Sequence, residues 1–307
     1  MRMRVGPLDR SSLPDATAVL AEACAYDRAA EVADEKLFGA GPRGRPQALG
    51  AWHGDALVGV AAIAGNRIRV LAVAPGARGR GVGSALLGAC EATARAAGET
   101  ALRTLDQPGN YLAPGIDERN AAAIAWLERR GFCRRAEPRV NLRIDVRDNP
   151  RVSAARAAEL AAAAAARGYE VRRARADEHA LLDAVAAEFG GAWPFELSRA
   201  LEYEPAGVHV AVKDGAYAAF AAHDGNNRGL GWFGPIGTWP AHRGQRLGEA
   251  LLLACLVDVA ARHARCEVAW IGPRSFYDQV AGIAAERRFV VLTRDLAAPT
   301  AGEMVAR

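Results

Sequence analysis

The sequence predicts a mixed α/β fold built from two tandem domains, each a mostly antiparallel mixed sheet flanked by helices. The chain has 307 residues, enough for two domains at about 150 residues each. Residues 72–90 and 237–255 align without a gap at a constant offset of 165, which indicates an internal duplication. Each copy comes after strand-like runs joined by Gly-rich turns and precedes an apolar-periodic helix, a layout typical of mixed α/β domains.

The first half is expected to begin with a meander. Three strands are predicted at 47–52, 56–63 and 67–73. The turns between them, 53–55 and 64–66, each contain Gly beside Asp or Asn, which is the chemistry of β-hairpins. A helix is predicted over 81–97, then a short strand, a second helix within 117–130, and a closing strand within 132–144.

The second half repeats this order. Strands are predicted at 208–213, 216–222 and 229–238, with Asp- and Gly-containing turns between them. The helix of the repeat is predicted over 247–263. A second helix within 274–287 and a strand at 289–293 close this half.

A linker divides the two halves. Residues 147–150, Arg-Asp-Asn-Pro, form a breaker, and Ser153 is positioned to cap an alanine-rich helix that ends at Gly168. Since alanines favour a helix but offer little to pack, this segment is predicted to connect the domains. The expected division is 1–147, a linker helix over 148–168, and 169–307.

The composition is that of a globular protein, with 51% hydrophobic and 24% charged residues. The net charge is only +4, and the charges are interspersed, so neither a nucleic-acid partner nor a membrane partner is expected. The five cysteines are scattered and form no C-x-x-C pair, which argues against a disulfide framework or a cysteine-based zinc site. No metal is expected.

The N-terminus carries no apolar stretch of the signal-peptide type, and no apolar run approaches the roughly 20 residues that a membrane span needs. A cytoplasmic protein is therefore expected. The oligomeric state is left open.

The repeated loop, residues 78–83 in the first copy, combines features of an anion site. It leaves a predicted strand and opens a helix, so several backbone N–H groups point at one place without an internal partner. Glycines at 79, 81 and 83 let a phosphate approach the backbone, and the adjacent arginines add positive charge. The pattern favours a pyrophosphate ligand.

Two phosphate-binding loops do not fit this pattern. No Gly-Lys followed by Ser or Thr is present, which excludes a Walker loop. The glycines fall as G-x-G-x-G after an antiparallel meander and not as G-x-G-x-x-G in a βαβ unit, which argues against a dinucleotide fingerprint. A Gly-rich turn without a ligand is the remaining alternative.

The motif Pro75-x-x-Arg78-Gly79-x-Gly81-x-Gly83, followed by Ala85-Leu86-Leu87, resembles the acetyl-coenzyme A loop of the GNAT N-acetyltransferase superfamily. The segment that begins at Asn120 and ends with Gly131-Phe132 resembles the second motif of that superfamily. The stretches 109–117, 233–238 and 271–277 are similar to those of bacterial two-domain members. The resemblance covers nearly the whole chain, once per half.

The resemblance implies a V-shaped opening between two strands, with acetyl-coenzyme A as co-substrate and direct attack of an acceptor amine on the thioester. Pantetheine would pair with the strand before each loop, and the pyrophosphate would lie on the loop and the helix N-terminus. The implied cofactor-binding residues are Leu71, Ala72, Val73, Arg78, Gly79, Arg80, Gly81, Val82, Gly83, Ser84 and Asn120 in the first half, and Ile236, Gly237, Thr238, Arg243, Gly244, Arg246, Leu247, Gly248 and Glu249 in the second.

The two halves differ at the positions that matter most. The family's usual proton donor is a tyrosine seven residues after the motif asparagine; counting from Asn120 places Leu127 there, which carries no proton. In the second half Phe276-Tyr277 matches the family's aromatic pair, so Tyr277 is the candidate general acid, with a structural aromatic as the alternative. The second loop has Arg246 in place of Gly81, which either clamps a phosphate or fills the site.

No general base and no acceptor are assigned. Neither pre-loop strand carries a carboxylate, and His209, His223 and Glu202 are open as bases or as structural groups. Aromatic and acidic residues at 193–204 and 111–118 would suit a cationic amine, or else form a solvated surface.

The leading hypothesis is an acetyltransferase for a small-molecule amine, with the first half holding acetyl-coenzyme A and Tyr277 marking the half that turns over. A non-catalytic acyl-coenzyme A sensor or scaffold is the alternative, and a protein amine acetyltransferase is a further one.

Overall fold

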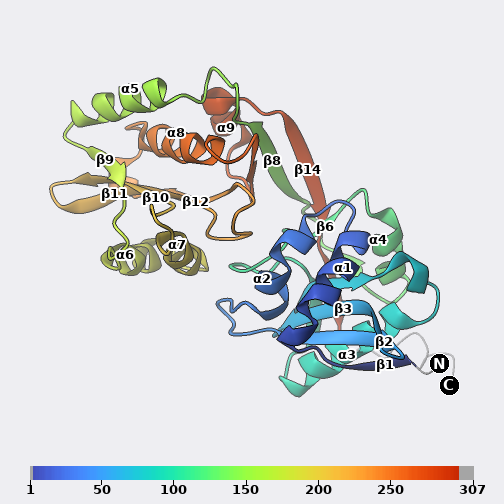
Figure 1. The fold of residues 1–307 in the computed structure, drawn as a ribbon. Coiled ribbons are helices and arrows are strands. Elements are labelled where there is room, and N and C mark those ends of the chain that lie inside the picture. Colours follow the sequence, from blue (N-terminus) through green and yellow to red (C-terminus); the bar gives the residue numbers. More distant parts are fainter. Residues whose placement is uncertain (1–2, 297–307) are drawn as a thin grey trace. The chain divides into compact units, whose positions relative to one another are not determined.

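The computed structural model describes residues 3–296, and the predictions for residues 1–2 and for the last part of the second domain, 297–307, lie outside this range. The chain divides into two compact units (Figure 1). Unit 1 consists of the described residues of Met1–Arg139 and Arg288–Arg307, and unit 2 is Val140–Arg287. These units differ from the linear division expected from the sequence because the strands at 139–145 and 292–295 each lie in the sheet of the opposite half.

The sheet of unit 1 has seven strands in the order β1-β2-β3-β4-β5-β15-β7. Their bounds are Met3–Pro7 (β1), Gln47–His53 (β2), Ala56–Ala64 (β3), Arg67–Val73 (β4), Ala101–Thr104 (β5), Cys133–Arg134 (β7) and Leu292–Asp295 (β15). The antiparallel strands β2 to β4 agree closely with the predicted meander. The strand from the end of the sequence, β15, pairs with β5 and β7 and so lies between them.

The second sheet has eight strands in the order β6-β14-β8-β13-β12-β11-β10-β9. Their bounds are Ile116–Asp117 (β6), Arg139–Asp145 (β8), Glu170–Arg173 (β9), Val208–Lys213 (β10), Ala216–His223 (β11), Trp232–Thr238 (β12), Arg265–Val268 (β13) and Ala285–Val290 (β14). β8 lies in the closing strand predicted for the first half, but it pairs with β13 of unit 2 and not with the sheet of unit 1. In both sheets the registered pairs are antiparallel except β4–β5 and β12–β13, which confirms the mostly antiparallel mixed sheets.

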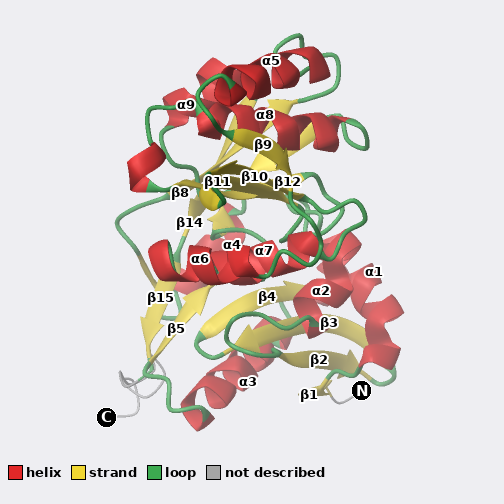
Figure 2. Ribbon diagram, turned by 90° about the vertical axis from the view of Figure 1, so that its left-hand side faces the viewer, coloured by secondary structure: helices red, strands yellow, loops and turns green. Residues whose placement is uncertain are grey.

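The helices of unit 1 lie on both faces of its sheet (Figure 2). They are α1 (Leu13–Ala23), α2 (Ala33–Phe38), α3 (Val82–Ala96) and α4 (Ala121–Glu128). α3 covers one face of β2 to β4, and α1 and α2 cover the other. The core beneath α3 includes Leu86, Cys90 and Ala94, which recur at helical spacing on its buried side.

In unit 2, α5 (Ala154–Ala165) and α8 (Leu247–Ala260) cover one face of the sheet, while α6 (Ala180–Glu188) and α7 (Trp193–Leu201) cover the other (Figure 1). α9 (Arg274–Ala281) precedes β14. The helix predicted to extend to residue 287 ends earlier because Gly282, with φ +76°, interrupts it and strand β14 begins at Ala285.

The helix expected to be a linker is part of the core of unit 2. Ser153 caps α5 as predicted, through its hydroxyl oxygen and the Arg156 N–H. Leu160 and Ala164 of α5 are buried against α8, which is itself apolar on nearly all sides. A helix without a polar face needs cover on both sides, and α5 supplies the outer cover that α3 of unit 1 does not require.

Candidate active site

The parallel strands of unit 1 separate along β4. β4 and β5 pair only at Arg67 with Arg103 and at Ile68 with Thr104, although β4 continues to Val73. The N–H of Ala74 donates to Val58 O on β3 at 3.0 Å. Because peptide groups alternate along a strand, the backbone groups of Leu71 and Val73 face the side that β5 has left.

Unit 2 contains the same opening in the same register. β12 and β13 pair only at Trp232 with Glu267 and at Phe233 with Val268, which are the positions of the unit 1 pairs on β4 plus 165. The N–H of Trp239 donates to Ala218 O at 3.0 Å, as Ala74 does in unit 1. The backbone of Ile236 and Thr238 is therefore turned toward the opening.

Each strand continues through a short 3₁₀ turn and an arginine into the loop. Arg78 Nε donates to Val73 O at 3.1 Å, and Arg243 Nε donates to Thr238 O at 3.4 Å. Arg78 also reaches Ala23 O, at 3.4 Å. These two predicted cofactor residues thus fasten the loop to the end of its own strand.

The loop of unit 1 presents bare backbone. Gly79 and Gly81 have φ values of +74° and +82°, and a Cβ added to either would meet no atom within 4 Å. Gly81 is the N-cap of α3, and no side chain caps the helix. The N–H groups of Val82, Gly83 and Ser84 therefore form a helix N-terminus that no side chain caps, which is the arrangement that binds anions.

The loop of unit 2 differs because it carries its own charges. Arg246 adopts φ +56° in place of Gly81, and its Nη2 lies 2.6 Å from Glu249 Oε2. Glu249 is the third residue of α8 and corresponds to Ser84. An acidic side chain at this position already interacts favourably with the helix dipole, so the N-terminus of α8 has a carboxylate of the chain beside it.

The second helix of each unit packs on the first in the same way. Trp126 lies against Gly83, 3.3 Å from the position of an added Cβ, and Phe276 lies against Gly248 at 3.5 Å. This contact makes Trp126 and Phe276 equivalent positions. Leu127 and Tyr277, which follow them, are then equivalent as the motif count predicted.

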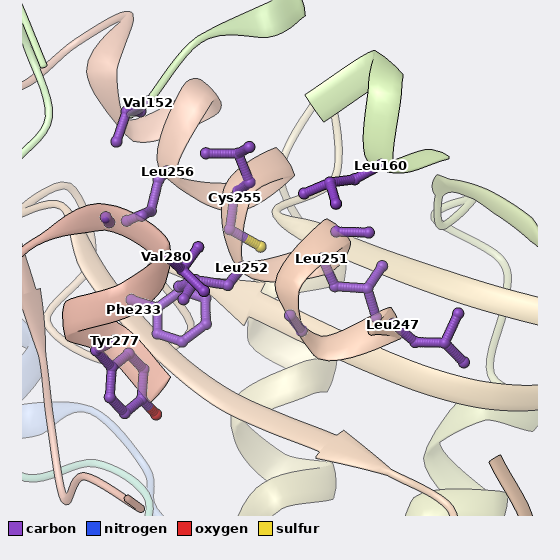
Figure 3. Close-up of a cluster of buried hydrophobic side chains, with 14 of the residues drawn as sticks. Val152, Leu160, Phe233, Leu247, Leu251, Leu252, Cys255, Leu256, Tyr277 and Val280 are labelled. Carbon is purple, nitrogen blue, oxygen red and sulfur yellow. The ribbon is translucent and has the colours of Figure 1, made fainter. Parts of the chain in front are cut away.

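Tyr277 is buried, with 4% of its surface exposed. Its ring contacts those of Phe233 and Phe276, and Figure 3 shows its hydroxyl on the side away from Leu252 and Leu256. Burial raises the pKa of Tyr277 to about 12, against a backbone hydrogen bond from Gly272 that acts in the opposite direction. The phenol is therefore protonated at neutral pH.

Asn120, the motif asparagine, is the N-cap of α4, and its side chain does not cap the helix. In the same unit, sequence reasoning missed a buried polar cluster around Asn110. The Asn110 amide donates to Glu35 O and Ala40 O at 2.9 Å, and its carbonyl accepts from the buried Lys36 ammonium at 2.9 Å. The cluster connects the chain before β6 to the end of α2. The composition of this polar stretch gives no sign of the cluster, which becomes visible only from the burial of its side chains in the structure.

The two histidines that sequence left open as bases lie together under α8. His209 Nε2 is 2.7 Å from Asp258 Oδ2, and His223 Nε2 is 3.4 Å from the same oxygen. Arg173 also binds Asp258, at 2.7 Å. Although burial opposes the charge, hydrogen bonds from these partners hold the pKa of Asp258 well below its usual range. Glu202 pairs with Arg228 at 2.9 Å.

Residues 3–296 contain no group of three or more His, Cys, Asp or Glu side chains arranged to hold a metal ion. Over the same range, every helix is too short or too polar to cross a membrane.

The sequence matches the acetyltransferase (GNAT) family over residues 20–132 and 178–282, one region in each half. The chain belongs to the GNAT family. Its two matched regions contain the two strand–loop–helix sites, so the tandem GNAT architecture expected from the sequence is confirmed. Membership supports an acyltransferase activity, and GNAT proteins generally use acetyl-coenzyme A.

Solved structures share this tandem fold. A tandem GNAT protein from the clavulanic acid biosynthesis pathway superposes with a TM-score of 0.67 at 22% identity, covering 97% of this chain and 100% of that one. A GCN5-related N-acetyltransferase from Sphaerobacter thermophilus gives 0.64 at 17% identity, covering 96% of both chains.

A third structure contains a GCN5-related glucosamine N-acetyltransferase region within a fungal multi-domain GH3 β-N-acetylglucosaminidase, with a TM-score of 0.73 at 16% identity. The match covers 95% of this chain but only 38% of that one. No curated protein matches the sequence. At these identities the three likenesses show the fold.

Proposed function

We propose that the protein is an acetyl-coenzyme A-dependent N-acetyltransferase whose cofactor binds on the loop of unit 1. The observation that carries this proposal is that the splayed strand β4 leads into an uncapped helix through Gly79 and Gly81, around which a Cβ would meet no atom within 4 Å. The loop therefore offers bare amides to a diphosphate, and β4 offers the pantetheine arm the backbone of Leu71 and the N–H of Val73, whose carbonyl is already bound by Arg78.

In this proposal the chain's residues have separate roles. The backbone of Leu71 to Val73 pairs with the pantetheine amides, and the loop from Arg78 to Ser84 binds the pyrophosphate. Asn120 lies at the start of α4, in the second motif of the same family region. The thioester supplies an activated acetyl carbonyl; the acceptor nitrogen forms the amide bond as the C–S bond breaks, the amine loses a proton and the thiolate gains one.

Unit 2 is proposed to bind the cofactor more weakly, since Arg246 occupies the loop and Glu249 places a negative charge where the phosphate would lie. Tyr277 is proposed as the proton donor to the thiolate at the opening of unit 2. A phenol with a pKa of about 12 holds its proton at neutral pH and can donate it. Unit 1 would then hold the cofactor tightly, while Tyr277 marks the unit that turns over.

For the acceptor we propose a small-molecule amine, with a protein amine as the alternative. Two of the structural neighbours have names that refer to small molecules: one name includes glucosamine and the other the clavulanic acid biosynthesis pathway. They support this choice through the shared tandem fold alone.

A matched pair of substitutions tests the cofactor site. Gly79 and Gly244 have nearly the same φ, +74° and +78°, and both have open surroundings, so Gly79→Trp and Gly244→Trp impose the same backbone strain on the two loops. Calorimetry with acetyl-coenzyme A should show a loss of about tenfold or more for Gly79→Trp, equivalent to about 1.4 kcal/mol. Gly244→Trp should bind within about twofold of the wild-type chain. Equal losses, or a loss for Gly244→Trp alone, would place the tight site elsewhere.

A second function, a non-catalytic acyl-coenzyme A sensor, is favoured by two observations. Unit 1 has Leu127 where the family has its acid, and unit 2 has a self-paired loop. Coenzyme A release, followed with a thiol reagent across small amines and N-terminal peptides, separates the two functions. Amine-dependent release that falls about 10²-fold in Tyr277→Phe supports the enzyme. Binding with only slow hydrolysis, unchanged in Tyr277→Phe, supports the sensor.

A further inference from the structure

Arg130 lies beside the N-terminus of α3 although it is far from the repeated loop in sequence. Its Nη2 donates to Ser84 Oγ at 3.0 Å, and its Nη1 donates to Trp126 O at 3.0 Å. Its guanidinium carbon lies 4.0 Å from the centre of the Trp126 ring. Trp126 in turn packs against Gly83, so Arg130 is held in place over the first turn of α3.

Within residues 3–296, the charge on Arg130 is not neutralised. Among the residues that the structure describes, no carboxylate forms an ion pair with it. Arg78, the conspicuous arginine of the loop, is used by the carbonyls of Val73 and Ala23. Arg130 is thus a fixed positive charge next to three free helix amides, and a site of this kind attracts a diphosphate, which carries one negative charge on each of its two phosphates.

Unit 2 has different residues at the equivalent positions. Counting from the matched pair Trp126 and Phe276, Arg130 corresponds to Val280, which is buried in the core. Ser84, the partner of Arg130, corresponds to Glu249, which pairs with Arg246. If Arg130 served only to connect two helices, unit 2 would be expected to have a similar residue. Instead, at these positions the arginine without a carboxylate partner occurs only beside the bare loop of unit 1, and the loop of unit 2 has the Arg246–Glu249 pair.

We propose that Arg130 is a phosphate-binding residue that clamps the pyrophosphate of the acyl-coenzyme A bound on the loop of unit 1. Its guanidinium and the amides of α3 bind the diphosphate together, and Trp126 and Ser84 orient the guanidinium. This inference rests on the proposed cofactor site. It adds Arg130, which stands at a position that the second motif leaves unspecified.

The test compares Arg130→Met with Arg135→Met. Methionine keeps an unbranched chain over Trp126 and removes the charge, while Arg135 is an exposed arginine of the same unit whose loss changes the net charge equally. Calorimetry is performed with coenzyme A and with dephospho-coenzyme A, which retains the pyrophosphate but lacks the 3′-phosphate. Arg130→Met should weaken both ligands about tenfold, and Arg135→Met should leave both within about twofold.

The salt dependence of binding distinguishes a direct charge contact between Arg130 and the ligand from a purely structural role of Arg130. The loss in Arg130→Met should shrink between about 0.05 M and about 1 M NaCl, because screening weakens the contact in the wild-type chain as well. A loss that is equal at both salt concentrations would show a structural role and overturn the proposal. So would a loss confined to coenzyme A, which would place Arg130 on the 3′-phosphate, or the absence of any loss.

The outcome also distinguishes this inference from the proposed function. A wild-type chain that binds neither ligand overturns both. A wild-type chain that binds, with Arg130→Met unchanged, overturns the role of Arg130 and leaves the cofactor site intact.

Discussion

In each unit the first helix of the repeat, α3 or α8, covers one face of a sheet. The strands of the two sheets pair in the same register, but the side chains on the covered faces differ. The strand pairs place Leu49 and Ile63 of unit 1 where unit 2 has His209 and His223. The repeat offset of 165 places Thr93 where unit 2 has Asp258. Leu49 and Ile63 belong to an apolar core, whereas the histidines bind the half-buried carboxylate of Asp258.

This difference shows what the fold requires and what it leaves free. Both units keep the splayed strands, the arginine that fastens the loop, and the aromatic packed on a helix glycine. They have diverged in the side chains under the first helix and in the charges at its N-terminus. The backbone of the site is thus preserved in both units, while the electrostatics that would select a ligand differ.

The largest effect should come from removing β15. A chain that ends at Val291 loses the strand between β5 and β7, together with the fully buried Leu292 and the buried pair of Arg294 with Glu91. Glu91 then keeps only its ion pair with the more exposed Arg95, at 3.6 Å. Because the pairing on both sides of β15 and the burial of Leu292 are lost as well, unit 1 should lose its cooperative unfolding. Hydrogen exchange at β5 and β7 measures this, with unit 2 as the internal reference.

A chain that ends at Leu296 is the control, since it keeps β15 and removes only residues 297–307. It should exchange as the full chain does. If the shorter chain retained protected amides in β5, the exchanged strand would not be what holds the sheet of unit 1 together.

Much of the fold could be predicted from the sequence because the signals are local. The meander strands are short, mostly apolar runs bounded by Gly-containing turns, and the observed β2 to β4 and β10 to β12 agree with them within about two residues for most bounds. The exchange of β8 and β15 has no such signal. A strand's own residues do not encode which of two similar sheets it joins, because both offer an unpaired edge of the same kind.

The candidate site, like the fold, was predictable where the signal lies in single residues and not where it depends on three-dimensional contacts. The loop glycines and Arg246 could be read directly, since backbone φ and the absence of a Cβ are properties of single residues. The Arg246–Glu249 pair, the fastening role of Arg78 and the position of Arg130 depend on side-chain direction in three dimensions. Arg130 had a weak signal: it is one helical turn after Trp126, the spacing at which two side chains meet.

The second prediction concerns the half-buried polar network around Asp258. Asp258→Ala leaves His209, His223 and Arg173 without their shared carboxylate and should destabilise unit 2 by about 2–3 kcal/mol. Thr93→Ala, at the equivalent position of unit 1, loses one hydrogen bond from its hydroxyl to Gln47 and should cost about 1 kcal/mol. Chemical denaturation of the two variants measures the difference. Comparable losses in the two variants would show that the network around Asp258 contributes no more to stability than the single hydrogen bond of Thr93.

A third prediction reverses the difference between the loops. The double variant Arg246→Gly with Glu249→Ser gives unit 2 the residues of unit 1 at positions 81 and 84. Removing the carboxylate from the N-terminus of α8 and the side chain from the loop should strengthen cofactor binding there about tenfold. Calorimetry should then show two binding events in place of one tight event. Arg246→Gly alone, which leaves Glu249 unpaired, should give less than the double variant, and an unchanged stoichiometry in both would contradict the blocking role of this pair.

The smallest effect should be the pH dependence of unit 2. Burial disfavours the charged form of His223, but the neighbouring carboxylates of Asp224 and Asp258 outweigh burial and raise its pKa above the ordinary value. A raised folded-state pKa means that protonation stabilises the fold below the unfolded pKa of about 6.5, and that this contribution is lost as the pH rises through the folded value. Thermal unfolding followed from pH 6 upward should therefore show a fall in Tm of a few degrees. His223→Gln should flatten this fall, whereas Ile63→Val, a change at the equivalent apolar position of unit 1, should lower Tm by the same amount at every pH. A fall that persists in His223→Gln would assign the pH dependence to another group.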